Sequence, residues 1–327
     1  VLIRDGAAIQ TLEAADVIVF DKTGTVTRGA PVLTEIRLAA GWNDPAVLRL
    51  AAALEDVSEH PLGAAVAAAA RERGIPLSDV AEFEAIPGLG VVGRVDDRQV
   101  LVGSRRLLAR QEVSSDELEA DAERLESRGR TVMFVAVDGQ AIGLLAVADR
   151  IKDDSRESIR LLHELGLETV MLTGDNERTA AAVAEEVGID DVRAGLLPAD
   201  KVEAIRGLQA TGRTVAMVGD GINDAPSLIR ADVGIAIGTG TDIAIESADM
   251  IVVQGSLMGV VRAVRLSRAT FRKIRQNLFW AYFYNTIAIP VAILGLLHPI
   301  LAEAAMAGSS ITVVANANSL RRARIDD

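Results

Sequence analysis

Three apolar segments of the chain each end in an aspartate that lies in a glycine-containing turn. They are residues 15–21, 167–175 and 212–220. Each segment is short and rich in β-branched residues, which is typical of a fully buried strand. Helical patterns with glycine stops separate the strands, and this alternation predicts a parallel α/β sheet. We therefore expect Asp21, Asp175 and Asp220 to meet at the carboxyl edge of that sheet, where such folds bind ligands.

The segment between residues 34 and 147 has a different pattern. An alanine-rich helix pair is followed by strand-like stretches, and the last two of these join at Asp-Gly, a typical hairpin turn. This predicts an α+β domain inserted into a discontinuous α/β domain that comprises residues 1–33 and 148–260. The joints near residues 33 and 148 are then candidate hinges. Beside the second joint, Asp149 and Lys152 either stabilise it or belong to the solvated surface.

The last part of the chain is predicted to cross a membrane twice. A helical approach with six basic residues precedes residues 277–297, which contain no charge over roughly the 20 residues that span a bilayer. Residues 300–317 form a weaker second span that contains Glu303. The flanking basic residues place both ends in the cytoplasm. Residues 261–320 would thus form the approach helix and a transmembrane hairpin with His298 in its outer loop, and residues 321–327 a cytoplasmic tail. The alternative is a buried pair of helices in a soluble protein.

The overall composition excludes several classes of protein. A formal net charge of −12 argues against nucleic acid as a partner. The chain contains no cysteine and therefore has no disulfide or thiolate metal site. It begins without Met, and its first residues lack the apolar core of a signal peptide, so we expect a fragment of a longer protein.

The residues at the predicted sheet edge fit phosphoryl transfer. Asp21 either caps a turn or acts as a nucleophile that forms an aspartyl phosphate. Such a site also needs groups that neutralise charge on the transferred oxygens. The neighbouring loops offer the hydrogen-bond donors Thr173, Gly174 and Asn223, the cation Lys201, and the Mg²⁺ ligands Asp220 and Asp224.

Four motifs together resemble those of the cation-transporting P-type ATPases, within the haloacid-dehalogenase-like (HAD) superfamily. They are DKTGTVT (21–27), TGDN (173–176), PADK (198–201) and GDGINDAP (219–226). The resemblance implies a Rossmann-like sheet of the HAD type. It also implies phosphorylation of Asp21 by MgATP, followed by hydrolysis of the phosphate coupled to ion transport. It adds Lys22, Thr23 and Asp175 to the catalytic residues and implies that Mg²⁺ is held by Asp21, the Thr23 carbonyl and Asp220.

Two other functions remain as alternatives. A phosphatase of the same superfamily would have a second aspartate, as general acid, two positions after the nucleophile, where this chain has Thr23. A hydroxyl group of high pKa is a poor acid at neutral pH, so the phosphoenzyme should persist, and this favours a transporter. A nucleotide-binding regulator without catalysis is the other alternative, and the presence of Asp21, Lys201 and Asp220 argues against it.

The inserted domain resembles the nucleotide domain of the heavy-metal branch of these pumps. The basis is SEHP (58–61) followed by a Gly-x-Gly loop, although either motif alone is common in turns. The resemblance implies that the nucleotide is bound by Glu55, His60, Gly88, Gly90 and Gly103. Ser104 stands where relatives commonly have Asn, so its role stays open. His163, on an amphipathic helix, is interpreted as structural.

Polar residues within the two predicted spans indicate an ion path. They are Tyr284 and Asn285 in the first span and Met306, Ser309 and Ser310 in the second. The alternative is that the Asn and Ser residues only join the helices by hydrogen bonds. YN followed by MxxSS is similar to the copper(I)-exporting subgroup, and a thioether suits Cu(I). Pumps for Zn(II), Co(II) or Ag(I) remain alternatives.

The resemblance also implies partners and parts that this chain lacks. The Cys-Pro-Cys span, the other earlier spans and the actuator domain of the family are absent from the sequence. We therefore expect the chain to bind MgATP but not to transport ions by itself. The complete pump would be a multi-pass protein of the plasma membrane, with cytoplasmic catalytic domains and possible delivery of Cu(I) by a chaperone.

Overall fold

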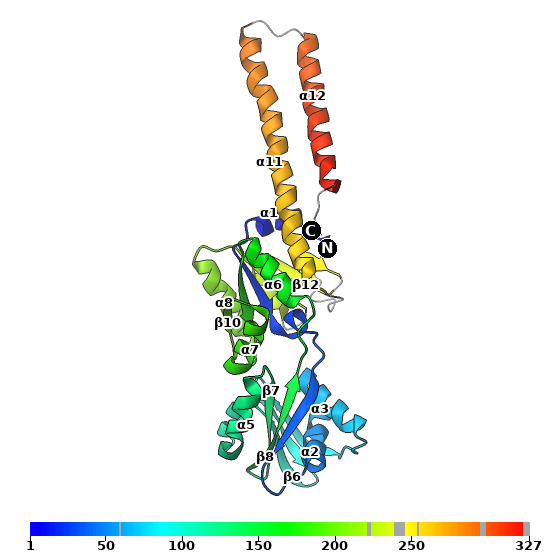
Figure 1. The fold of residues 1–327 in the computed structure, drawn as a ribbon, viewed down its shortest axis with the longest axis vertical. Helices are drawn as coiled ribbons and strands as arrows, with labels where there is room; N and C mark the ends of the chain where they lie inside the picture. The colour runs from blue at the N-terminus through cyan, green and yellow to red at the C-terminus, as the bar shows by residue number, and fades with distance from the viewer. Residues whose placement is uncertain (59, 221–223, 239–245, 254, 295–298, 323–327) are drawn as a thin grey trace.

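The computed structural model of the chain describes all residues except 59, 221–223, 239–245, 254, 295–298 and 323–327. The described residues form an elongated molecule with a helical hairpin at one end, a parallel-sheet domain in the middle and an inserted domain at the other end (Figure 1). Two residues singled out from the sequence, Asn223 and His298, lie outside the described residues.

The parallel-sheet domain contains, among the described residues, a seven-stranded sheet in the order β1-β13-β12-β11-β2-β9-β10. Its strands are β1 (Leu2–Ile3), β2 (Val17–Asp21), β9 (Glu168–Leu172), β10 (Asp191–Arg193), β11 (Val215–Gly219), β12 (Val233–Ile237) and β13 (Met250–Val252). All neighbouring strands pair in parallel except for β1 and β13, which pair with each other antiparallel. The predicted parallel α/β sheet is confirmed.

Helices cover both faces of this sheet, which explains why its strands are apolar throughout. They are α1 (Gly6–Glu13), α6 (Ser155–Glu164), α7 (Glu177–Val187), α8 (Pro198–Ala210) and α9 (Ala225–Arg230). Ile18 and Phe20 of β2 belong to the core cluster that includes residues of α1, α6 and α7. Val17 and Val19 point the other way, into the cluster that includes residues of α8 and α9.

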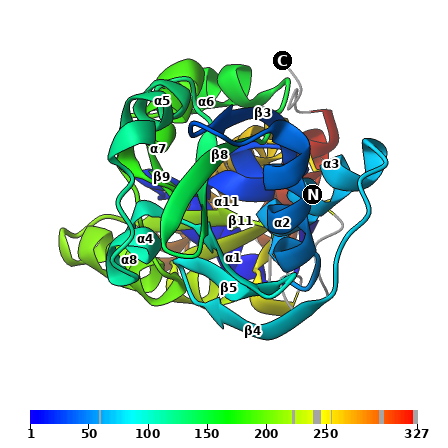
Figure 2. The same ribbon diagram turned by 90° about the horizontal axis from the view of Figure 1, so that it is seen from below.

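The inserted domain contains an antiparallel sheet in the order β3-β8-β7-β6-β5-β4. Its strands are β3 (Val32–Leu38), β4 (Val80–Ile86), β5 (Gly90–Val95), β6 (Arg98–Gly103), β7 (Thr131–Val137) and β8 (Gln140–Ala148). Helices α2 (Asp44–Asp56) and α3 (Pro61–Glu72) pack on one face, and α4 (Arg105–Arg110) and α5 (Asp116–Glu126) on the other (Figure 2). The predicted insertion of an α+β unit is therefore confirmed.

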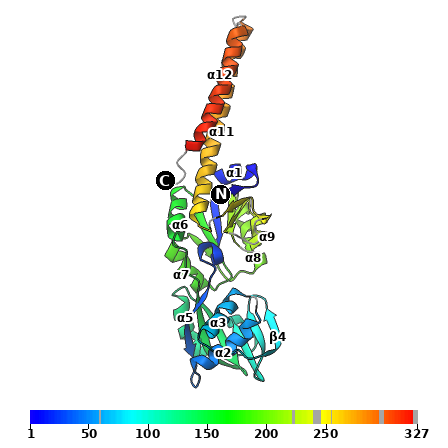
Figure 3. The ribbon, with the colours of Figure 1, turned by 90° about the vertical axis from the view of Figure 1, so that its right-hand side faces the viewer.

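The hairpin consists of α11 (Met258–Ile293) and α12 (Pro299–Asn318), followed by the short 3₁₀ turn η3 (Ser319–Arg322). It projects from the parallel-sheet domain, away from the inserted domain (Figure 3). The first turns of α11 belong to the core of that domain, where Val260, Val261 and Val264 are fully buried.

The expectation of two membrane-crossing helices is not met by the described helices. Within the described part of the chain, every helix is too short or too polar to span a membrane. The physical reason lies in the sequence of the hairpin. Basic residues as far as Arg275, and then Tyr284 and Asn285, interrupt the apolar run of α11, while Glu303 lies within α12.

Two antiparallel connections join the domains. Thr27 forms an isolated bridge with Ile151, and the Arg28 amide donates to the Arg150 carbonyl over 2.8 Å. The carboxylate of Asp149 accepts hydrogen bonds from the Thr27 hydroxyl (2.5 Å) and from the backbone amides of Gly29 (3.1 Å) and Ala30 (3.2 Å). Of the two interpretations of Asp149, these contacts favour stabilisation of the joint.

Candidate active site

Asp21 is the last residue of β2, a central strand of the parallel sheet, with β9 and β11 on either side. Its side chain is buried, with 8% of its surface exposed. The strand ends here because Lys22–Val26 form a tight turn in which Gly24 has φ = +75°, a conformation that glycine adopts at little cost. A Cβ atom on Gly24 would lie 1.6 Å from an Asp220 carboxylate oxygen, so only glycine fits here.

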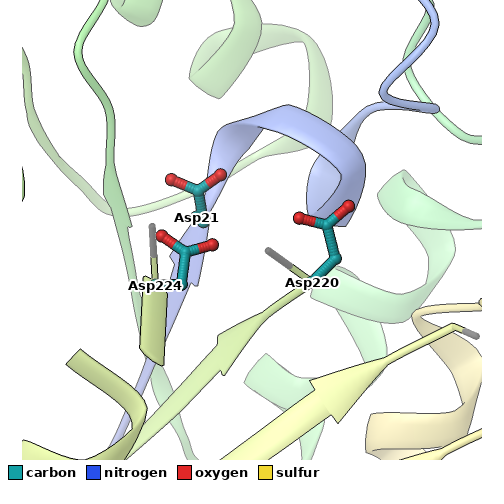
Figure 4. Close-up of side chains that lie close together, drawn as sticks. All are labelled: Asp21, Asp220 and Asp224. Carbon is teal, nitrogen blue, oxygen red and sulfur yellow. The ribbon is translucent and has the colours of Figure 1, made fainter. Parts of the chain in front are cut away.

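Three carboxylates converge at this edge of the sheet. Oxygen atoms of Asp21, Asp220 and Asp224 all lie within 4.8 Å of one another (Figure 4). Burial, followed by the neighbouring charge of Asp224, raises the pKa of Asp21 to about 6. Burial, followed by the charge of Asp21, likewise raises the pKa of Asp220 to about 6. A set of mutually repelling oxygen ligands of this kind fits a hard divalent cation such as Mg²⁺.

The ammonium group of Lys201 lies between two of these carboxylates. It forms ion pairs with Asp21 and with Asp224, the latter at 3.0 Å. Burial alone would lower the pKa of Lys201, but the two carboxylates outweigh that effect and raise it. Lys201 therefore remains charged beside Asp21, where it can neutralise an incoming anion.

The loop after β9 contains the predicted residues Thr173, Gly174 and Asp175. The Asp175 amide donates to the Thr173 hydroxyl over 3.1 Å. The Asp175 carboxylate forms an ion pair with Lys22 and accepts a hydrogen bond from Thr131 of the inserted domain over 3.2 Å. Lys22 and Asp175 are thus paired with each other in the described structure.

Two further residues at this turn are Lys152, which contacts it and whose role was left open in the sequence, and Thr25, which belongs to it and was not singled out. Lys152 donates from its ammonium group to the Gly24 carbonyl over 2.6 Å, so it supports the turn next to Asp220. The Thr25 hydroxyl is completely buried and has no hydrogen-bond partner among the described residues. The Thr23 side chain is exposed at the edge. Only the repetition of Thr in DKTGTVT could have indicated Thr25.

The predicted nucleotide residues Glu55 and His60 lie at the junction of α2 and α3. Glu55 is buried, and its carboxylate packs so closely on Gly63 that a Cβ atom there would lie 2.3 Å from it. This burial raises the pKa of Glu55 to about 7. His60 is the N-cap of α3, and its Nδ1 accepts the Leu62 amide over 3.2 Å. Desolvation lowers the pKa of His60, and the charge of Asp175 opposes that shift.

The three predicted glycines have structural roles in the inserted domain. Gly90 and Gly103 face each other across β5 and β6, and a Cβ atom on either would lie 2.3 Å from a backbone oxygen. Gly88 has φ = +70° and lies close to Leu197 of the parallel-sheet domain. A Cβ atom on Gly88 would lie only 2.5 Å from a Leu197 methyl group. The Gly-x-Gly loop therefore lies against the segment that leads into α8 and Lys201.

The residues predicted to bind the transported ion lie on the helical hairpin. Tyr284 packs near the rings of Trp280 and Phe283 on α11. Asn285 on α11, and Met306 and Ser310 on α12, are exposed, while Ser309 is half-buried. His163, in contrast, contacts the Thr169 hydroxyl and the Asp190 carboxylate at 2.9 Å each, which suits the structural role expected for it.

Comparison with protein families gives a match to the haloacid dehalogenase-like hydrolases over residues 15–232. The chain is 52% identical to a probable copper-exporting P-type ATPase V of Mycobacterium tuberculosis, over 98% of this chain and 42% of the relative. It is 48% identical to a copper-exporting P-type ATPase of Bacillus subtilis, over 99% of this chain and 40% of the relative. The chain thus spans about two-fifths of the length of these relatives.

Two solved structures resemble the chain as well. A zinc-transporting PIB-type ATPase in the E2·Pi state matches with a TM-score of 0.71 and 38% identity, over 98% of this chain and 52% of that one. The catalytic domain of the CPx-ATPase CopB-B, from a study of conformational changes on nucleotide binding, matches with a TM-score of 0.63 and 30% identity. That match covers 80% of this chain and 92% of the other.

Proposed function

Because the chain belongs to the P-type ATPases, within the haloacid dehalogenase-like hydrolases, we propose that it is the catalytic part of an ATP-driven copper(I) exporter that is phosphorylated on Asp21. The observation that supports this best is the contact of the Asp21 carboxylate with Lys201 at the carboxyl edge of the sheet, beside Asp220 and Asp224. That arrangement supplies a nucleophile, a fixed cation and oxygen ligands for Mg²⁺ at one point.

In the proposed reaction, a carboxylate oxygen of Asp21 attacks the γ-phosphorus of ATP. The bond from this phosphorus to the β,γ-bridging oxygen breaks, and ADP leaves with the bonding electrons. Lys201 neutralises charge on the transferred oxygens, and Thr173, Gly174 and Asn223 donate hydrogen bonds to them. Mg²⁺ held by Asp21, the Thr23 carbonyl and Asp220 would offset the remaining negative charge when bound.

The fate of the acyl phosphate distinguishes a pump from a phosphatase. The exposed Thr23 occupies the position two residues after the nucleophile, and its hydroxyl group is a poor general acid at neutral pH. The acyl phosphate should therefore persist until another part of the complete protein promotes its hydrolysis. This supports the pump over the phosphatase.

We assign residues 1–33 and 148–260 to a phosphorylation domain and residues 34–147 to a nucleotide-binding domain. The start of β3 at Val32 and the end of β8 at Ala148 support these limits. ATP would lie between the domains and be held by five residues of the inserted one: Glu55, His60, Gly88, Gly90 and Gly103. The position of His60 near Asp175 and of Gly88 against Leu197 supports this placement.

Copper(I) is the proposed cargo, because relatives named as copper exporters are 46–52% identical, against 38% for the structure named as zinc-transporting. We propose that Tyr284, Asn285, Met306 and Ser310 contribute to its path. The complete protein would be a pump of the plasma membrane with its catalytic domains in the cytoplasm, and the hairpin of this chain, residues 261–320, would lie against other helices of that protein. Large apolar side chains exposed on it support this, such as Phe279 (60%) and Ile293 (80%). We propose a copper chaperone as a partner of the complete protein.

Labelling with γ-³²P-ATP tests the proposal. The complete protein should form an acid-stable, hydroxylamine-sensitive phosphoenzyme that requires Mg²⁺ and is promoted by Cu(I) more than by Ag(I), Zn(II) or Co(II). Asp21→Asn should abolish the label. Rapid hydrolysis of small phosphate esters without trapped label would instead indicate a phosphatase. A preference for Zn(II) or Co(II) would overturn the copper assignment alone.

A further inference from the structure

A buried carboxylate of the inserted domain lies directly on the phosphorylation domain. Glu126, the last residue of α5, has 1% of its side chain exposed. Within its own domain it pairs with Arg105. From the other domain, the side-chain amide of Asn176 donates a hydrogen bond to the Glu126 carboxylate over 3.0 Å, and a guanidinium nitrogen of Arg178 lies 3.4 Å from it. Arg178 also pairs with Glu123 of α5 at 2.6 Å.

Further hydrogen bonds extend this α5–α7 contact, which we define as Glu123 and Glu126 against Asn176 and Arg178. The Thr179 hydroxyl donates to the Arg130 carbonyl over 2.7 Å. Thr131 donates to Asp175, the carboxylate that pairs with Lys22 beside the nucleophile. The α5–α7 contact thus places the glutamates of α5 beside the first turn of α7, whose N-cap is Asn176. A negative charge is favourable at the N-terminus of a helix.

Arg105 already compensates the charge of Glu126 within the inserted domain, so folding of that domain does not require Arg178. The side chain of Arg178 is half exposed, and its two ion-pair partners lie across the domain boundary. Its contribution is therefore to the relative position of the domains. A second contact between the domains is the close approach of Gly88 to Leu197.

We propose that the α5–α7 contact positions the nucleotide domain over Asp21, with Arg178 and Glu126 as positioning residues for ATP. The inference depends on the proposed function, because the nucleotide domain matters only if ATP is the phosphoryl donor. A small ester such as p-nitrophenyl phosphate reaches Asp21 without the nucleotide domain, and it therefore serves as an internal reference.

Arg178→Ala tests this, with Arg160→Ala as the matched control. Arg160 is equally exposed and pairs with two glutamates, Glu157 and Glu164, but all three belong to α6. Loss of an exposed ion pair should raise the KM for ATP about two- to fivefold in Arg178→Ala. Its turnover of p-nitrophenyl phosphate should equal that of wild type. Arg178→Lys should keep the KM for ATP close to that of wild type. Arg160→Ala should alter neither the KM for ATP nor the turnover of p-nitrophenyl phosphate.

Two kinetic outcomes would overturn the proposal. One is an Arg178→Ala variant that behaves like Arg160→Ala, and the other is an equal loss with both substrates, which would indicate a merely structural role. If the wild-type protein transferred phosphate from neither substrate, the proposed function would fail, and the α5–α7 contact would then be judged by a distance measurement.

That measurement uses the absence of natural cysteine. Glu72→Cys on α3 and Glu185→Cys on α7 introduce two exposed labelling sites, one in each domain. Spin labels at these sites should give a narrow distance distribution in the otherwise wild-type chain and a broader one with Arg178→Ala. Identical distributions would contradict the proposal whatever the catalytic result.

Discussion

At the scale of single residues, the Lys22–Val26 turn leaves no room for a side chain at residue 24. Gly24→Ala would place a Cβ atom 1.6 Å from an Asp220 carboxylate oxygen, so this carboxylate must leave its position beside Asp21. A displacement of about 1 Å at a catalytic site can cost roughly a hundredfold in rate. We expect a loss of that order in phosphoenzyme formation, measured with γ-³²P-ATP.

Gly139→Ala is the control for this substitution. Gly139 also has positive φ, +82°, but nothing lies within 4 Å of its Cβ position. The change should cost about 1–2 kcal/mol of stability from backbone strain and leave phosphoenzyme formation intact. Equal losses of activity in the two variants would mean that strain, and not the approach to Asp220, explains the requirement for glycine.

Glu55 predicts a dependence of stability on pH. Burial raises its pKa from 4.5 to about 7, so the folded protein binds more protons than the unfolded chain between these values. The free energy of unfolding should therefore fall as pH rises through this window, by up to about 3 kcal/mol. Urea denaturation of the wild type and of Glu55→Gln, from pH 5 to 8, isolates the effect. Parallel pH profiles would show that Glu55 does not titrate in this range.

At the scale of elements, the start of α8 determines where Lys201 lies. The Asp200 carboxylate accepts the Leu197 amide over 2.9 Å and so holds the first turn. Asp200→Ala should cost about 1 kcal/mol of stability. It should also slow phosphoenzyme formation roughly tenfold, because the adjacent Lys201 loses its fixed position. Rapid-quench labelling measures this rate.

The N-cap of α2 provides a matched control in the other domain. Asn43 accepts the Ala46 amide over 3.0 Å, so Asn43→Ala should destabilise by a similar amount. Because α2 lies far from Lys201 in the chain and packs on the antiparallel sheet, turnover of p-nitrophenyl phosphate should be unchanged. A normal rate in Asp200→Ala would show that the cap does not position Lys201.

The elements were more predictable from the sequence than their contacts. The strand that ends at Asp21 and the loop motifs fixed which residues reach one edge, because parallel strands place their carboxyl ends together. The partner of Lys22 could not be derived, since a long flexible side chain can reach either Asp21 or Asp175. The roles of Glu55 and His60 still rest on resemblance, because burial and capping alone explain their places in the fold.

At the scale of the whole molecule, the contacts between domains were invisible in the sequence. Glu126 and Arg178 are 52 residues apart on helices whose charge pattern is that of ordinary solvated surface. The expectation of membrane-crossing helices was wrong for another reason, because it counted uncharged residues and did not weigh how apolar each helix is. The polar groups of α11 and α12 lower their mean hydropathy.

The hairpin has two physically different parts, and shortening the chain separates them. Val260, Val261 and Val264 of α11 are buried in the parallel-sheet domain, whereas the side chains beyond Phe271 are largely exposed. A chain that ends at residue 271 should fold, retain phosphorylation by p-nitrophenyl phosphate, measured as a burst of p-nitrophenol, and stay in the supernatant when phospholipid vesicles are sedimented. The 327-residue chain should sediment with the vesicles, because its exposed apolar surface gains about 25 cal/mol per Å² on transfer to lipid.

A chain that ends at residue 257 completes the comparison. It lacks the three buried valines, each worth about 1.5–3 kcal/mol, and should not fold stably. Circular dichroism during thermal unfolding distinguishes the two shortened chains. Sedimentation of the chain that ends at residue 271, or failure of the 327-residue chain to sediment, would place the lipid-binding surface elsewhere than on the outer part of α11 and on α12.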